Sequence, residues 1–386
     1  MILWNRVVVL DYGKGNTMKK LLKLKRNYLL LLLPFSLLLI LLARKSIFFA
    51  EHVHALFIYR GLSQFVSLIT GIIPVSLAEL LILILPVILI ILLIRFIVRM
   101  VKDRANRKIH AVKGLINMLC VISVGLFLFT MLGGLNYYRY SFAHYSNLEI
   151  DKYSVEELYG LTKQLADQAN ELRSQVPAVD DNGIFMLSMS KYELAKEANK
   201  AMKSISGEYP VLGGRYANPK PVLLSPLMSY ADITGIFIPF TMEANVNVDI
   251  PDYSIPSTML HEMAHQRGFM REDEANFIAY LAGICSDNVE LMYSSVMLAL
   301  ISSGNALYRQ STDLYFEIRG TYSEGVIADI RDNSQYWAKY EDTVVSTVSN
   351  RINDTYLKAN AQADGVKSYG RMVDLLLARY KASMQD

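Results

Sequence analysis

His261, Glu262 and His265 form an H-E-x-x-H pattern within the run HEMAHQRGF. Residues four apart share one face of an α-helix, so both imidazoles can bind a single zinc ion. Glu262 is then placed to act as general base toward a zinc-activated water. Pro256 suits the first turn of such a helix and Gly268 suits its end. The pattern predicts a hydrolytic zinc site on a helix. The alternative is a pair of surface histidines on an ordinary amphipathic helix.

A catalytic zinc ion also needs a third protein ligand and an open position for water. The other four histidines are His52, His54, His110 and His144, all in or beside the apolar N-terminal third. A carboxylate is therefore the expected third ligand. The segment REDEANFIAYLAG, which begins at Arg271, supplies three acidic side chains at the start of a second predicted helix.

Glu272 and Glu274 are the two candidates for this ligand. The face of Glu272 carries small residues, namely Ala275, Asn276, Ala279 and Gly283. Such a face lets the second helix approach the first closely and places Asn276 to orient the carboxylate. Glu274 lies on the side of the bulky Phe277. We favour Glu272 and keep Glu274 as the alternative, while acidic residues that only complement the helix dipole are a third interpretation.

Three stretches carry a resemblance to a known family. They are ITGIFIPFTMEANVN, HEMAHQRGF with EDEANFIAYLAG, and YLKANAQADGVKSYGRMVDLL near the C-terminus. Together they resemble the bacterial membrane proteins that share the domain of unknown function 3810, over nearly the whole chain. The resemblance implies a zinc-peptidase-like metal site and names no substrate. The E-x-x-A-N pattern resembles, more loosely, the second helix of gluzincin peptidases, which favours Glu272. Its spacing from His265 is shorter than in gluzincins, and Arg271 stands where a metzincin has its third histidine.

The chain is 52% hydrophobic, and its apolar residues are concentrated toward the N-terminus. Three segments are long and apolar enough to span a membrane: Tyr28 to Ala43, Pro74 to Ile94, and Gly114 to Leu135. A buried core helix is the alternative for each, and a cleaved signal peptide is a further alternative for the first. We expect a basic N-terminus at residues 1–27, a membrane domain at 28–135 and an extracytoplasmic domain at 136–386. Residues 1–17 look like an extension before a natural start at Met18.

Basic residues indicate the orientation in the membrane. They cluster before the first segment and between the second and third, whereas the first loop has only Arg44, Lys45 and Arg60. The positive-inside rule then puts the N-terminus in the cytoplasm and the domain with HExxH outside. The first loop is amphipathic and is expected to lie along the lipid interface, with His52 and His54 solvated.

The C-terminal domain has mainly helical patterns. Ser154 with Glu157, and Ser190 with Glu193, have the spacing of capping boxes. The segments 233–240 and 244–250 are the best strand candidates. The predicted fold class is mainly α: three transmembrane helices, then an α-rich (α+β) zincin-like domain with a small β-sheet before the HExxH helix. The first of the two strands, with Pro239 allowed only at an edge, either pairs with an extended substrate or belongs to an ordinary small sheet.

These features predict a membrane-anchored zinc metallopeptidase that hydrolyses a peptide bond, with Zn²⁺ as its cofactor. Its partners would be the lipid bilayer and a peptide or protein substrate of the cell envelope, with no nucleic acid. The alternative is a metal-binding sensor or degenerate peptidase that binds an extracytoplasmic ligand. Cys120 and Cys285 are not expected to form a disulfide. The candidates for stabilising an oxyanion are Tyr369, Arg371, Tyr253 and Tyr280.

Overall fold

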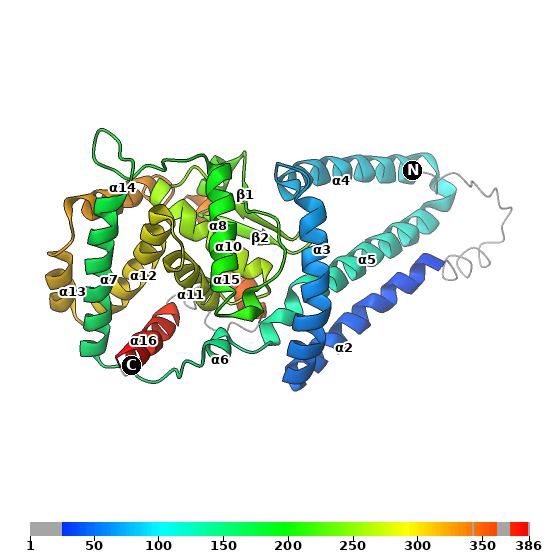
Figure 1. Ribbon diagram of the computed structural model, residues 1–386. Helices are drawn as coiled ribbons and strands as arrows, with labels where there is room; N and C mark the ends of the chain where they lie inside the picture. The colour runs from blue at the N-terminus through cyan, green and yellow to red at the C-terminus, as the bar shows by residue number, and fades with distance from the viewer. Residues whose placement is uncertain (1–24, 342, 361–370, 385–386) are drawn as a thin grey trace. The chain divides into compact units, whose positions relative to one another are not determined.

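The computed structural model describes residues 25–341, 343–360 and 371–384. The described chain is mainly helical and contains one small three-stranded sheet (Figure 1). It divides into two compact units. Unit 1 contains the described residues up to Leu41 together with Leu81–Met131, and unit 2 contains Leu42–Leu80 and the residues from Leu132 onward. Most of the predicted N-terminal segment at residues 1–27, and Tyr369, lie outside the described residues.

Unit 1 is built from long apolar helices. They are α2 (Leu32–Lys45), preceded by the short helix η1 (Lys25–Leu31), α4 (Leu77–Lys102) and α5 (Arg107–Leu132), with η3 (Arg104–Asn106) before α5. The rings of Phe35 in α2 and Phe127 in α5 stack with centroids 6.0 Å apart. By length and composition these helices can cross a membrane, and the three predicted segments fall on them. They are compatible with a membrane protein.

A fourth helix, α12 (Val289–Gln310), also has the length and hydropathy of a span, but 67% of its most apolar window is buried inside the protein. It packs against α7 and α11 in unit 2. Its apolar side chains are thus covered mainly by the neighbouring helices of unit 2.

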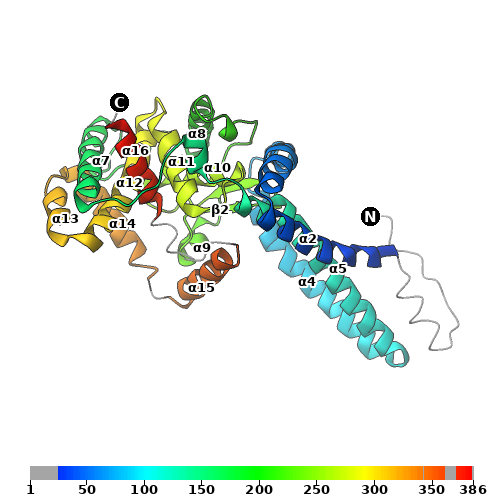
Figure 2. The same cartoon turned by 90° about the horizontal axis from the view of Figure 1, so that it is seen from below.

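Unit 2 contains the remaining elements (Figures 1 and 2). Its helices are η2 (Phe49–Tyr59), α3 (Arg60–Thr70), η4 (Gly134–Tyr138), α6 (Phe142–Ser146), α7 (Val155–Gln175), α8 (Lys191–Ile205), η5 (Pro210–Leu212), α9 (Ser225–Tyr230), η6 (Asp252–Ser254), α10 (Ile255–Gln266), α11 (Glu272–Ile284), α12, α13 (Thr312–Arg319), α14 (Glu324–Trp337), α15 (Val344–Ala359) and α16 (Met372–Ser383). The two predicted capping boxes are confirmed: the Ser154 and Ser190 hydroxyls accept from the backbone N–H of Glu157 and Glu193.

The sheet consists of β1 (Lys220–Pro221), β2 (Gly235–Ile238) and β3 (Glu243–Val246) in the order β1-β3-β2. β2 is antiparallel to β3, with Phe237 opposite Ala244, and β1 is parallel to β3. The strands before the HExxH helix are therefore present but shorter than predicted, and β1 was not predicted because two residues carry no periodicity. Pro239 follows β2, which lies at an edge of the described sheet.

The core of unit 2 surrounds α10. Leu260, Met263 and Ala264 on this helix are fully buried, and α10 packs against β2, β3, α8, α11 and α12. A helix enclosed in this way holds its side chains in fixed rotamers, because the neighbouring elements leave no room for alternatives. The fold therefore supplies a rigid support for any chemistry that α10 carries.

The segment between α2 and α4 packs as part of unit 2. Glu51 in η2 is buried and forms an ion pair with Arg139 at 3.0 Å. The expectation of two solvated histidines here is wrong for His54, which is fully buried, while His52 is exposed. The sequence shows this loop as amphipathic but does not show which of its faces meets protein.

Candidate metal centre

Local signals in the sequence define both ends of α10. Pro256 occupies the first turn, where its missing N–H leaves no helical hydrogen bond unmade. The helix ends at Gln266, and Gly268 has a φ of +88°, a conformation that glycine adopts without steric cost. The resulting turn lets the backbone N–H of Phe269 bond to the carbonyl of Ala264 at 3.2 Å. The first turn of α11 then follows at once.

Three potential ligand atoms converge between α10 and α11. His261 Nε2 lies 3.0 Å from His265 Nε2. The Oε2 atom of Glu272 lies 3.1 Å from His261 Nε2 and 3.5 Å from His265 Nε2. Within the described residues, these three side chains form a group that could hold a metal ion. The structure thus brings together the three side chains that the sequence singles out as ligands.

The other ring nitrogen of each histidine is already engaged. His265 Nδ1 lies 2.7 Å from the carbonyl oxygen of Phe269, to which it can only donate. His261 Nδ1 lies 2.7 Å from the Oδ1 atom of Asn276. When both imidazoles are neutral, these contacts favour a proton on each Nδ1, which leaves each Nε2 for a metal ion. Metal-binding histidines usually have such an outer partner, which fixes the tautomer and the ring orientation.

Glu262 lies beside this group and is only 4% exposed. Its Oε2 atom has no hydrogen-bond partner within the described part of the chain. β2 runs close by: a Cβ atom at Gly235 would lie 2.5 Å from Glu262 Oε1 and 2.8 Å from the Thr258 methyl carbon. Glycine at 235 is what allows the strand to approach the glutamate so closely.

Burial and mutual attraction set the protonation of the group. Burial raises the pKa of Glu262 to about 7, although the two histidines oppose the shift. Burial would lower the pKa of His265, but the charge and hydrogen bond of Glu272 raise it to about 9. Burial works against ionisation of Glu272 as well, yet the histidines hold its pKa well below the usual range. The centre therefore attracts positive charge, whether a proton or a metal ion.

The donor set fits zinc. Ligand atoms of a tetrahedral zinc site, each about 2.0–2.2 Å from the ion, lie roughly 3.3–3.6 Å from one another. The three atoms here are separated by 3.0 to 3.5 Å. Two neutral imidazoles and one carboxylate are also the ligands of several catalytic zinc sites, in which the fourth position stays open. His261, His265 and Glu272 would hold the ion.

The other candidates in the first turn of α11 have different partners. Glu274 accepts a hydrogen bond from the backbone N–H of Phe142 at 3.0 Å and pairs with Arg271 at 3.2 Å. Asn276 contacts His261 rather than the carboxylate of Glu272, so its predicted partner is corrected.

The small-residue face of α11 also serves two neighbours rather than one. A Cβ atom at Gly283 would lie 1.8 Å from the Ser295 hydroxyl oxygen on α12. The hydroxyl of Ser295 donates to the carbonyl of Ala279 at 3.2 Å. The far end of this face therefore lets α12 approach closely, whereas Glu272 and Asn276 near its start face α10.

Tyr356 in α15 is a neighbour of the centre that sequence reasoning missed. Burial raises its pKa, a hydrogen bond from Tyr137 at 3.3 Å opposes the shift, and the negative charge of Glu272 adds to it. The hydroxyl thus lies within the electrostatic reach of the Glu272 carboxylate. It comes from far along the chain, and no local pattern in the sequence marks it.

The tyrosine and arginine residues proposed from the sequence have other surroundings. Tyr253 is buried beside Tyr293, with ring centroids 6.5 Å apart. Burial raises the pKa of Tyr280, and the charge of Arg379 opposes this shift. Arg371 lies 3.7 Å from Asp273.

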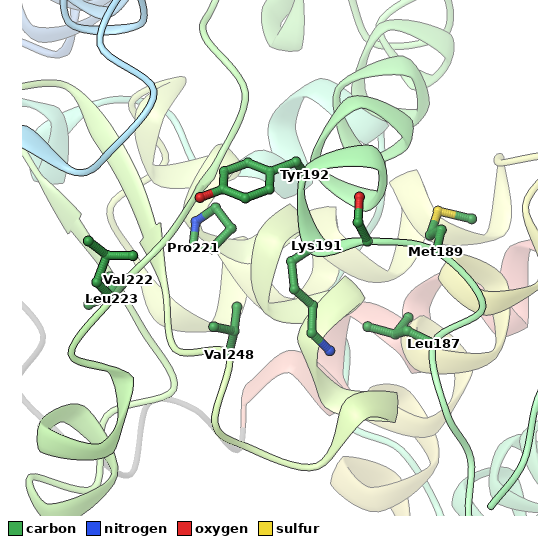
Figure 3. A pocket seen from close by; sticks show the side chains of 9 residues that line it. Leu187, Met189, Lys191, Tyr192, Pro221, Val222, Leu223 and Val248 are labelled. Atoms are coloured by element: carbon green, nitrogen blue, oxygen red, sulfur yellow. The ribbon is translucent and has the colours of Figure 1, made fainter.

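An open groove lies beside β1, at the edge of the sheet opposite β2, and none of its lining residues is a candidate metal ligand (Figure 3). Its volume is about 550 Å³. Lys191 and Tyr192 at the start of α8 line one side, and Val222 and Leu223 after β1 line the other. The ammonium group of Lys191 pairs with Asp252. The groove is mostly apolar, so it contains little that could perform chemistry.

Comparison with known proteins agrees with the resemblance seen in the sequence. The family model described as protein of unknown function (DUF3810) matches residues 54–377. The chain belongs to this family. No curated protein and no solved structure matches the chain. The match includes residues 54–76 of the segment between α2 and α4, the three candidate metal ligands and Tyr356.

Proposed function

We propose that this DUF3810 protein is a membrane-anchored zinc metallopeptidase that hydrolyses peptide bonds. One observation carries the proposal: three ligand atoms converge within 3.5 Å of one another beside a buried glutamate whose Oε2 has no partner in the described residues. A zinc site with a purely structural role needs no such glutamate, because its four positions are filled by ligands. The proposed domain is zincin-like, with β2 and β3 before the HExxH helix.

Each group has a distinct role in the proposed reaction. Bound zinc would acidify water and polarise the scissile carbonyl. Glu262 accepts the proton from the attacking water and later passes it to the leaving amine. β2 pairs with the extended substrate as an added strand, and Gly235 brings this strand next to Glu262. Tyr356 donates a hydrogen bond to the oxygen that gains negative charge.

The test combines metal analysis with peptide cleavage by the purified full-length chain in detergent. Wild type is expected to contain about one zinc ion per chain and to cut members of a peptide library. Glu262→Gln keeps the same shape and the zinc but loses turnover, because an amide cannot take up the proton. Asp273 is an acidic residue near the site and pairs with Arg371. The variant Asp273→Asn is the matched control and should retain cleavage.

The outcomes separate the two functions predicted from the sequence. Zinc in the protein without any cleavage, in wild type and Glu262→Gln alike, would favour the metal-binding sensor. Equal zinc content in wild type and in a variant that lacks both histidines would contradict the metal site itself.

We also propose that α2, α4 and α5 cross the bilayer and that α12 does not, since two thirds of its apolar window is buried by protein. The basic residues between α4 and α5 then place unit 2 outside the cytoplasm. A reporter fused after Asp386 should be active only outside the cytoplasm. Activity of the same fusion in the cytoplasm would reverse this topology and exclude substrates of the cell envelope.

A further inference from the structure

The outward face of α3 is apolar. Ser63, Ser67 and Thr70 point into unit 2 and are buried. The opposite face carries large apolar side chains that are 40% to 65% exposed: Leu62, Phe65, Leu68 and Ile69. A helix on a water-exposed surface normally has the reverse arrangement. This separation of polar and apolar faces is that of a helix lying in a lipid interface.

A second exposed apolar segment lies where the chain enters α4. The backbone N–H groups of Leu223 and Leu224 donate to the carboxylate of Glu79, at 3.1 and 2.7 Å. Glu79 is the third residue of α4, so this segment lies within one helical turn of the start of that helix. Leu223 is 64% exposed and Leu227, in α9, is 61% exposed.

The central strand of the sheet holds the start of α4. The N–H groups of Leu77 and Ala78 donate to the carboxylate of Glu243 in β3, at 3.1 and 2.8 Å. The first N–H groups of a helix have no partner within it, and a carboxylate there satisfies them and favours the helix dipole. The sheet that precedes the HExxH helix is thus fixed to the first residues of an apolar helix.

The side chain of Phe237 lies between the candidate metal centre and the cluster at the end of α5. Leu132, the last residue of α5, belongs to a buried cluster with Tyr59 against which Phe237 packs. The ring of Phe237 lies 6.5 Å from the ring of His265. The Tyr59 hydroxyl donates to the backbone carbonyl of His265 at 3.2 Å.

The turn that follows the edge strand β2 contacts α3. The hydroxyl of Thr70 donates to the carbonyl of Thr241 at 2.9 Å, three residues after the end of β2. Phe240, next to it, is 49% exposed. A peptide paired with β2 would therefore lie close to the C-terminal end of α3.

We propose that a lipid-facing surface, formed by the outward side of α3 and by Leu223, Leu224 and Leu227, rests on the bilayer and holds the metal site at the membrane surface. The substrate is then the juxtamembrane segment of a membrane-anchored polypeptide. This substrate class rests on the peptidase function proposed above. Lipid is the occupant because the surface is continuous along the chain with α2 on one side and α4 on the other, both of which have the length and hydropathy of spans.

The surface itself can be tested without any substrate. The full-length chain is placed in phosphatidylcholine liposomes with plain or brominated acyl chains, and tryptophan fluorescence is compared. Phe65→Trp and Leu227→Trp should lose the added fluorescence in brominated lipid, after subtraction of the wild-type signal. Phe316→Trp, 56% exposed on α13, is the control that keeps it. Equal quenching at positions 65 and 316 would overturn the proposed surface.

The substrate class is tested with one cleavable sequence, taken from the peptide library, in two forms. One form is joined to a single apolar helix in the same liposomes, and the other is a free peptide. Confinement to the membrane raises the effective concentration, so kcat/KM for the tethered form should be higher by about 100-fold. The double variant Phe65→Asp and Leu68→Asp should lose this advantage and still cut the free peptide. The control variant Phe316→Asp should keep both the advantage for the tethered form and the cleavage of the free peptide.

Failure of this inference differs from failure of the peptidase function. Equal rates for both forms, with Glu262→Gln inactive toward both, would overturn the juxtamembrane substrate and leave the peptidase in place. No cleavage of either form by wild type would overturn the peptidase, while the quenching experiment would still decide the lipid-facing surface. If the double variant does not fold, its zinc content shows this, and the single variant Phe65→Asp with the tethered substrate replaces it.

Discussion

Helices α10 and α3 are joined by a hydrogen bond from Gln266 to Ser67, yet they use polar side chains in opposite ways. In α10, most of which is buried, the two imidazoles turn toward one point together with the Glu272 carboxylate of α11. In α3 the hydroxyl groups turn inward and serve as hydrogen-bond partners, while Phe65 remains 65% exposed. The side chains of α10 face a point that could hold a metal ion, whereas those of α3 form hydrogen bonds within unit 2.

The difference shows how a buried polar group can be distinguished as structural or functional. The Ser67 hydroxyl accepts from the Gln266 amide and from the backbone N–H of Ala217, so it is satisfied within the protein. The Oε2 atom of Glu262 has no such partner among the described residues, whereas the two Nε2 atoms of α10 face each other and the Glu272 carboxylate around one point. An unpaired buried polar atom costs about 1–3 kcal/mol, which is tolerated where another molecule supplies the partner.

The strongest test of this contrast replaces the two histidines of α10. His261→Ala and His265→Ala are each expected to abolish stoichiometric zinc binding and all peptide cleavage, because two remaining ligands cannot hold the ion. Metal content is measured by mass spectrometry on the purified full-length chain. His144→Ala removes an exposed histidine and should retain the zinc. Retention of zinc in both α10 variants would make its histidines structural, like the serines of α3.

The second test compares two glutamates in the first turn of α11. Glu272→Ala should weaken zinc binding by more than the roughly 10–100-fold that loss of an outer partner causes. Glu274→Ala removes the acceptor of the Phe142 N–H and should change zinc affinity much less. Titration of both variants against a zinc chelator measures the difference. A larger loss in Glu274→Ala would mean that the carboxylate facing the metal is the other one.

Much of the site was predictable because it is local. Residues four apart on one helix share a face, and Pro256 and Gly268 mark the ends of that helix, so the sequence predicts how His261 and His265 face each other. The choice of Glu272 over Glu274 followed from side-chain size along α11. Asn276 was assigned the wrong partner because the sequence does not give the angle at which two helices cross.

The packing of the segment before α4 was not predictable in the same way. Its amphipathic pattern predicts an interface, but protein and lipid both accept an apolar face. Buried His54 and the ion pair of Glu51 with Arg139 depend on residues that are distant in the chain. The position of Tyr356 near Glu272 is long-range too, since the two residues come from different helices that no spacing rule connects.

A smaller effect is expected from the strand that approaches the glutamate. In Gly235→Ala the new methyl group would meet Glu262 and Thr258, so β2 or the carboxylate must move by some tenths of an ångström. Misplacement of a catalytic group by about 1 Å can cost about 100-fold in rate, and the loss here should be at most of that order. Zinc content should stay unchanged. Gly61→Ala on α3, where a Cβ atom meets nothing within 4 Å, is the matched control and should keep full activity.

The smallest effect is expected at the hydrogen bond that joins α10 and α3. Ser67→Ala leaves the Gln266 amide and the Ala217 N–H without their shared acceptor, which costs about 1–3 kcal/mol in the free energy of unfolding. For a unit of this size the melting temperature falls by roughly 2–4 °C per kcal/mol. The α10 ligands do not touch this hydroxyl, so zinc content should match wild type.

Ser334→Ala removes an exposed hydroxyl on α14 and should change stability by no more than about 0.5 kcal/mol. Loss of zinc in Ser67→Ala without a lower melting temperature would show that α3 helps to set the metal site, and the division of roles between the two helices would then be wrong.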